Sequence, residues 1–150
     1  MTIEYFKKLF DYDAWANERM LTAMEATPNL AEEAAKKMSH LLQAKTVWVS
    51  RLIPGNPAGN FHTVLTPAAA RQLNSELKAT LEKYFGSLRE DQLSQKIAYQ
   101  NLKGLPFETV LSDILAHLVN HGTYHRGQVA TLIKRSGGEP PVTDYIAFVR

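Results

Sequence analysis

The stretch "TVLSDILAHLVNHGTYHRGQVATLIKRS", residues 109–136, carries the longest helical pattern in the chain. On a helix of 3.6 residues per turn its aliphatic side chains fall on one arc, which predicts an amphipathic helix with that arc against a core. His121 and His125 lie within the arc, whereas His117 and Gln128 lie at its edge. We therefore expect the two inner imidazoles to point into the protein. The aliphatic arc consists of Val110, Leu111, Ile114, Leu115, Leu118, Val129, Leu132 and Ile133.

Two helices are predicted at the start of the chain. Apolar residues at spacings of three and four indicate a helix over residues 3–26. Asn29 is the predicted N-cap of a second helix, whose first turn carries acidic residues and which ends at Pro54-Gly55.

A third helix follows a loop. Residues 54–65, "PGNPAGNFHTVL", are rich in Pro, Gly and Asn, which is typical of a loop. Thr66 followed by Pro67 indicates a helix start, so we expect a helix from there to about Phe85, with Gly86 as its terminator.

The remaining segments complete an all-α prediction. Residues 95–108, "QKIAYQNLKGLPFE", indicate a short hairpin or an extended excursion between the third and fourth helices. The tail from residue 139 starts irregularly and is expected to end in a short turn. Four long helices, one long crossover and no internal repeat predict a four-helix bundle that forms a single domain over residues 1–150.

Composition excludes several kinds of site. The chain has no cysteine, so the protein supplies neither disulfides nor a thiol nucleophile, and a transition metal must rest on histidine and carboxylate. The 17 Lys and Arg against 15 Asp and Glu are dispersed, which argues against a nucleic-acid partner. No apolar run approaches a membrane span or the core of a signal peptide, so we expect no membrane partner and a cytoplasmic location.

The inward histidine pair has the spacing of a metal site. Residues four apart on a helix have Cβ atoms about 5–6 Å apart, which lets His121 and His125 reach one ion. The drift around the helix axis makes His117 a poor third ligand. His40 lies near the margin of the apolar face of the second helix, so His40, His121 and His125 together predict a three-nitrogen site. Buried histidines that only hydrogen-bond to one another are the alternative.

The absence of known catalytic motifs excludes several classes of enzyme. The pair reads "HGTYH", so it lacks the glutamate of HExxH proteases. The chain contains no Glu-x-x-His motif, which argues against a di-metal carboxylate site. The chain contains no G-x-G-x-x-G, P-loop or G-x-S-x-G motif. Three imidazoles suit several ions: Zn²⁺ or Ni²⁺ is the leading prediction, with Fe²⁺ and Cu²⁺ as alternatives.

Several neighbours of the pair have predicted roles. Gln128 is expected to hydrogen-bond a ligand imidazole or a bound water, and His117 either orients a ligand or makes an ordinary polar contact. Arg126 is expected to pair with a carboxylate or to serve an interface. Gly122 lies on the inner arc, where the missing side chain allows close approach. His62 is expected to be exposed, and core packing is expected for most of the aromatic residues Tyr5, Tyr12, Trp15, Trp48 and Tyr124.

Four segments together resemble a known family. They are "DYDAWANERML" (11–21), "SHLLQAKTVWVSRL" (39–52), "LVNHGTYHRGQV" (118–129) and "GGEPPVTDYIAF" (137–148). With them the sequence resembles the DinB/YfiT-like family of metal-dependent enzymes over nearly its whole length. This family is distinct from the translesion DNA polymerase that shares the name.

The resemblance implies a four-helix bundle with one divalent metal, and its ligands match His40, His121 and His125. Relatives of the family use low-molecular-weight thiols such as bacillithiol or mycothiol, and many members are dimers, so a thiol partner and a homodimer are expected. Asp13, Asn17 and Asp144 match family-like segments and are predicted to edge the pocket.

The leading functional prediction is a metal-dependent enzyme that acts on a small electrophile by thiol-dependent S-transfer. A metal ion would deprotonate a thiol or a water near neutral pH and so provide the nucleophile that the chain lacks. Metal-dependent hydrolysis is the runner-up. A non-catalytic metal-binding stress-response dimer is the alternative of a different class.

Overall fold

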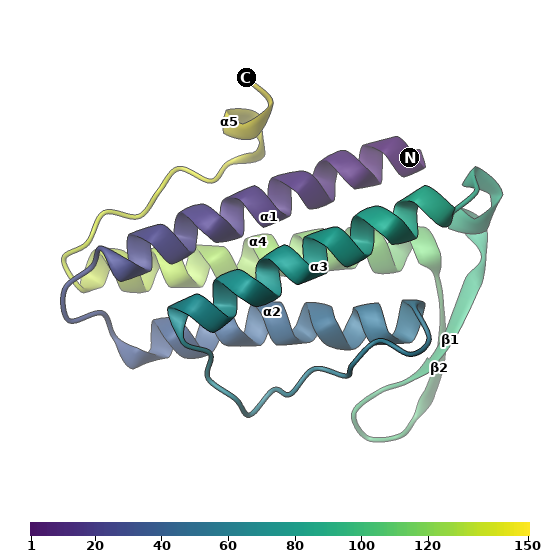
Figure 1. The fold of residues 1–150 in the computed structure, drawn as a ribbon, viewed down its shortest axis with the longest axis horizontal. Helices are drawn as coiled ribbons and strands as arrows, with labels where there is room; N and C mark the ends of the chain where they lie inside the picture. The colour runs from purple at the N-terminus through teal and green to yellow at the C-terminus, as the bar shows by residue number, and fades with distance from the viewer.

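Four long helices dominate the computed structural model, which describes all residues 1–150 (Figure 1). They are α1 (Ile3–Glu25), α2 (Glu32–Leu52), α3 (Pro67–Ser87) and α4 (Leu111–Arg135). A 3₁₀ turn, η1 (Glu90–Ser94), precedes an antiparallel hairpin of β1 (Lys96–Gln100) and β2 (Pro106–Val110), and α5 (Tyr145–Val149) ends the chain. The predicted all-α bundle and its hairpin are confirmed.

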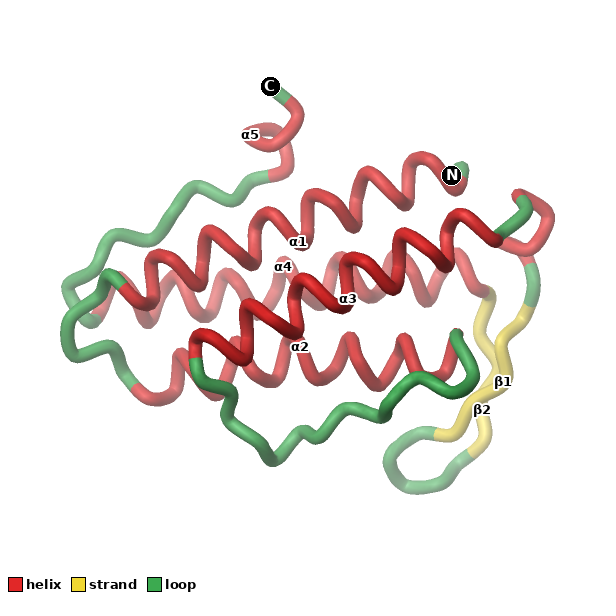
Figure 2. The backbone as a smooth tube through the Cα atoms, in the orientation of Figure 1, coloured by secondary structure: helices red, strands yellow, loops and turns green.

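The helices form a bundle in which α1 and α2 each pack against both α3 and α4. Helices α2 and α3 run in the same direction, so residues 53–66 return along the length of the bundle before α3 begins (Figure 2). This segment is the predicted long crossover, hereafter the crossover loop. None of the helices is long and apolar enough to cross a membrane.

The helix ends follow local chemistry, with two departures from the prediction. Thr66 caps α3 by accepting a hydrogen bond from the Ala69 N–H, as expected. Asn29 does not cap α2: it lies in the turn before it with φ +54°, and Ala31 holds the N-cap position without a side-chain bond. Gly86 is part of the last turn of α3 and does not terminate it.

The core lies between the four helices. Each helix contributes fully buried side chains, and the predicted arc of α4 supplies six of them. The buried apolar side chains among them share one continuous cluster. Examples from α1 to α4 are Phe6, Met20, Leu42, Leu81, Leu115 and Ile133.

Only some of the predicted core aromatics are buried. Tyr12 and Trp15 pack against Tyr145 and Phe148 of α5, with ring centroids 5.2 Å and 5.5 Å apart for the pairs Tyr12–Tyr145 and Trp15–Phe148. This contact fixes the C-terminal tail on α1. Tyr5 and Tyr124 are 42% and 65% exposed because they lie on the outer faces of their helices, so these two do not join the core.

Candidate metal centre

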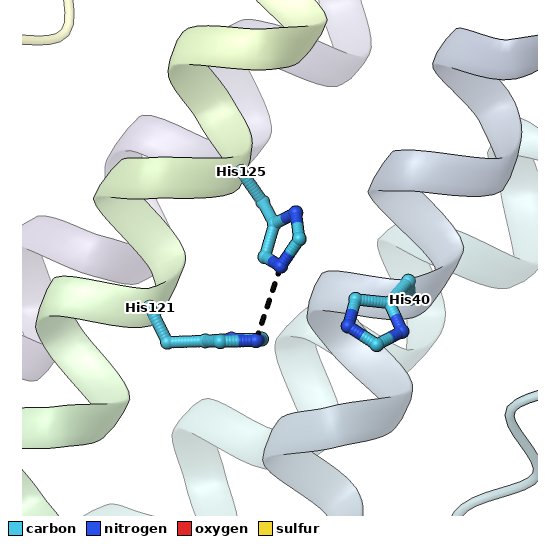
Figure 3. Close-up of side chains that lie close together, drawn as sticks. All are labelled: His40, His121 and His125. Atoms are coloured by element: carbon cyan, nitrogen blue, oxygen red, sulfur yellow. Dashed lines mark hydrogen bonds between the residues drawn. The ribbon is translucent and has the colours of Figure 1, made fainter.

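Helices α2 and α4 bring three histidines together in the middle of the bundle (Figure 3). His121 and His125 lie one turn apart on α4, and His40 faces them from α2. One ring nitrogen from each residue lies within 4.8 Å of the others. The two Nε2 atoms of His121 and His125 are 3.1 Å apart. The side chains singled out in the sequence as a group are therefore neighbours in space.

Gln128 orients one of these rings. Its Oε1 lies 3.0 Å from Nδ1 of His125, so the amide oxygen accepts the Nδ1–H of a neutral imidazole. That bond leaves the lone pair on Nε2, which faces His121. A ring held by a partner on its other nitrogen is the usual arrangement of a metal-binding histidine. Of the two partners predicted for Gln128, an imidazole or a bound water, the structure shows the imidazole of His125.

Burial keeps all three imidazoles neutral near pH 7. Desolvation lowers the pKa of His121 to about 4, with smaller contributions from His125 and His40. Desolvation likewise lowers the pKa of His40, and Lys37 adds to that effect. For His125, desolvation lowers the pKa although the bond to Gln128 opposes it. Neutral imidazole is the form that binds a metal ion.

The geometry fits a divalent transition-metal ion. Two nitrogens bound at about 2.1 Å to one tetrahedral ion lie about 3.4 Å apart, close to the observed 3.1 Å between the two Nε2 atoms. Three neutral nitrogen donors suit Zn²⁺, Ni²⁺, Cu²⁺ and Fe²⁺ better than Mg²⁺ or Ca²⁺. His117 is exposed and lies against Trp48 and His121, with ring centroids 5.6 Å away in each case, outside the group of three.

A buried polar network lies directly beside the histidines. Arg126 Nη1 donates to Asp13 Oδ1 at 2.5 Å and to Asn17 Oδ1 at 2.9 Å. Lys45 forms an ion pair with the other carboxylate oxygen of Asp13. Asn17 also donates to Asn74 Oδ1 at 3.0 Å, so the network joins all four long helices. Arg126 thus pairs with a carboxylate, one of the two roles predicted for it.

This network corrects the prediction that Asp13 and Asn17 edge the pocket. Both are fully buried on the inner face of α1, where their polar groups bond within the bundle. Burial alone would raise the pKa of Asp13, but the charges of Lys45 and Arg126 lower it below its ordinary value. Asp144 is exposed just before α5 and is not part of the pocket wall either.

Sequence reasoning missed Lys45 and Asn74. The available signal was the pair Asp13 and Asn17, one turn apart within an otherwise apolar face of α1. Two buried polar groups on one helix face require partners on the helices opposite.

Gly122 provides the room for this network. A Cβ at this position would collide with the Asp13 carboxylate and would crowd Arg126 Nη1. The predicted close approach is therefore confirmed, and the group that approaches is the ion pair.

A pocket of about 780 Å³ opens beside the histidines. Its wall includes His40 and His121, one face of α2, the crossover loop and the hairpin. His62 of the crossover loop is exposed, as predicted, and belongs to this wall. Aromatic and aliphatic side chains make up much of the rest, including Trp48, Phe61, Tyr99, Leu102 and Phe107.

Comparisons with known proteins agree with this architecture. A family model described as the DinB family matches residues 2–150. Protein DinB of Bacillus subtilis (strain 168) is 26% identical over an alignment 160 residues long, which spans 92% of this chain and 90% of that protein. The crystal structure of a DinB-like protein from Bacillus cereus ATCC 10987 matches with a TM-score of 0.70 at 22% identity, covering 93% of this chain and 96% of that one.

Proposed function

The chain belongs to the DinB family, and on that premise we propose that it is a metal-dependent enzyme that acts on a small electrophile. His40, His121 and His125 would hold one divalent transition-metal ion, with Zn²⁺ or Ni²⁺ as the leading candidates. The observation that carries the proposal is the convergence of three neutral imidazoles beside a pocket large enough for a small molecule.

Thiol-dependent S-transfer is the reaction we propose. When bound, the metal ion supplies a positive charge that lowers the pKa of a thiol or a water. The chain has no cysteine, so a sulfur nucleophile must come from a cosubstrate. In this proposal the three histidines bind the ion, Trp48 and Phe61 line the pocket beside it, and Gln128 holds the ring of His125.

Metal content tests the ligand assignment. We expect tag-free protein to retain about one divalent ion per chain by elemental analysis, and His40→Ala, His121→Ala and His125→Ala each to lose it. His62→Ala is the matched control, because His62 lies in the same pocket wall outside the group of three. Full metal content in the His121→Ala protein would refute the assignment.

Turnover assays separate the reaction classes. Each metal form is incubated with a panel of bacterial low-molecular-weight thiols and monochlorobimane, and the thioether product is followed by fluorescence. Product that depends on the thiol and is lost in His121→Ala supports S-transfer. Hydrolysis of an ester or amide panel without thiol supports a hydrolase, and a metal-loaded protein without turnover in either assay supports a binding protein.

A homodimer remains a separate prediction, checked by analytical ultracentrifugation.

A further inference from the structure

The pocket extends along one face of α2 from the metal-site histidine to an arginine. His40, Ala44, Val47, Trp48 and Arg51 recur at helical spacing and all belong to the pocket wall. Arg51 lies eleven positions after His40, which places their Cα atoms about 16 Å apart along the helix. The pocket therefore has an imidazole group at one position and a guanidinium three turns away.

Arg51 is held in place but keeps unused hydrogen-bond donors. Its guanidinium stacks on Trp48 and Tyr99, with its central carbon 4.5 Å and 4.9 Å from the two ring centroids. One nitrogen, Nη2, donates to the carbonyl oxygen of Gln100 at 2.8 Å. The Arg51 side chain forms no other hydrogen bond in the structure, so its remaining N–H groups are free to donate to an acceptor.

No negative charge in the pocket balances this guanidinium. Arg51 forms none of the salt bridges in the structure, unlike Lys45 and Arg126 in the interior. The residues that line the pocket include neither aspartate nor glutamate. A partly desolvated cation without a counter-ion favours an anionic ligand, and a planar guanidinium edge suits a carboxylate.

We propose that the pocket binds an elongated organic anion, whose carboxylate pairs with Arg51 while its flat apolar body lies against Trp48, Phe61 and Phe107. The anion subsite is a property of the pocket alone. The placement of the reactive end of the ligand toward His40 and His121 rests on the proposed function.

A purely structural role for Arg51 makes a different prediction. If the residue only joins α2 to the hairpin through Gln100 and Tyr99, its loss weakens charged and neutral ligands by the same factor. The ratio of the two affinities therefore separates the roles, whatever happens to stability.

The first experiment uses metal-free protein, so that a carboxylate cannot bind a metal ion. Dissociation constants of 4-phenylbutanoate and its neutral analogue 4-phenylbutanamide are measured by calorimetry. We expect the native protein to bind the carboxylate at least 10-fold more tightly than the amide. This ratio of affinities should fall to about 1 in Arg51→Met, whereas Arg51→Lys should retain part of the preference for the carboxylate. Arg19→Met is the matched control, because Arg19 also stacks on a tryptophan, Trp15, outside the pocket.

A second arm repeats the comparison on zinc-loaded protein with 4-(4-sulfanylphenyl)butanoate and its amide. Stronger binding of both thiols than of their sulfur-free analogues, lost in His121→Ala, supports the proposed orientation.

Three results of the first experiment, on metal-free protein, would overturn the anion subsite. They are equal affinity for carboxylate and amide in the native protein, a ratio of affinities unchanged in Arg51→Met, and no measurable binding of either compound. The outcomes that would overturn the anion subsite are all measured on metal-free protein, so the subsite and the proposed function fail independently.

Discussion

Gln128 is the side chain through which the protein controls the chemistry of His125. Replacing it with leucine removes the acceptor at 3.0 Å from Nδ1 and leaves both the ring orientation and the tautomer unfixed. We expect Gln128→Leu to lower zinc affinity about 10- to 100-fold, measured by competition with a chromophoric chelator. Thr131→Ala, an exposed change one turn further along α4, should leave the affinity unaltered. Equal affinities for the two variants would show that Gln128 has no orienting role.

The low pKa of His121 makes the metal-free fold sensitive to acid. Its folded-state pKa is about 4, against an ordinary value of 6.5, so the unfolded chain takes up a proton first as pH falls. The contribution to stability is therefore fully present above about pH 6.5 and is lost progressively as the pH drops toward 4. Urea unfolding of chelator-treated protein at several pH values should show this loss.

The same titration in His121→Asn provides the control, because asparagine does not ionise in this range. We expect a shallower fall in unfolding free energy between pH 6.5 and pH 4. Parallel curves for the two proteins would contradict the assignment of the pH dependence to His121.

Two glycines of α4 lie in opposite environments, one crowded and one open. Gly122 faces the Asp13–Arg126 ion pair, whereas a Cβ at Gly127 would meet nothing within 4 Å. Alanine favours helix by about 1 kcal/mol over glycine, so Gly127→Ala should raise the unfolding free energy by about 0.5–1 kcal/mol. Gly122→Ala should lower it by about 1–3 kcal/mol despite the same gain in propensity, because the new methyl group displaces buried charges. Chemical denaturation of both variants tests the pair, and stabilisation by Gly122→Ala would contradict the steric argument.

Sequence periodicity was sufficient to predict the four long helices and the direction in which the histidines point. The apolar arc of α4 predicted both the inward pair and the edge position of His117, since local spacing determines where a side chain points on a helix. The end of α4 was also predictable, because Gly137 adopts the left-handed conformation with φ +84° that favours glycine.

Features that depend on contacts between helices were less predictable. Asn29 looked like a helix cap, but it adopts positive φ in the turn, and the Ala31 N–H finds its acceptor in Ser136 Oγ at 3.2 Å, 105 residues away. Lys45 resembles a solvated lysine in the sequence, yet it is buried against Asp13 from another helix. Predicting such pairings requires knowledge of how the helices are arranged in space, and the spacing of residues along one helix does not provide it.

At the scale of the whole molecule, the Asp13 network fixes the four long helices relative to one another. Asp13→Ala leaves Lys45 and Arg126 buried without their anion, so we expect a loss of about 3–5 kcal/mol in unfolding free energy. Glu139→Ala removes the carboxylate of an exposed pair with Lys134, and little change is expected there. Urea unfolding compares the two variants. A small effect of Asp13→Ala would mean that the interior accommodates the two cations without it.

The division of the pocket between helices and loops has a consequence for how such proteins diversify. The three histidines stand on rigid helices, whereas Phe61, His62, Asn101 and Leu102 of the wall belong to the crossover loop and the hairpin turn. Loops accept substitutions and insertions that a packed helix does not. One helical frame with a constant group of three histidines can therefore acquire new selectivity through changes in two short segments. Proteins that share the histidines need not share a substrate, and their loop sequences are the place to read the difference.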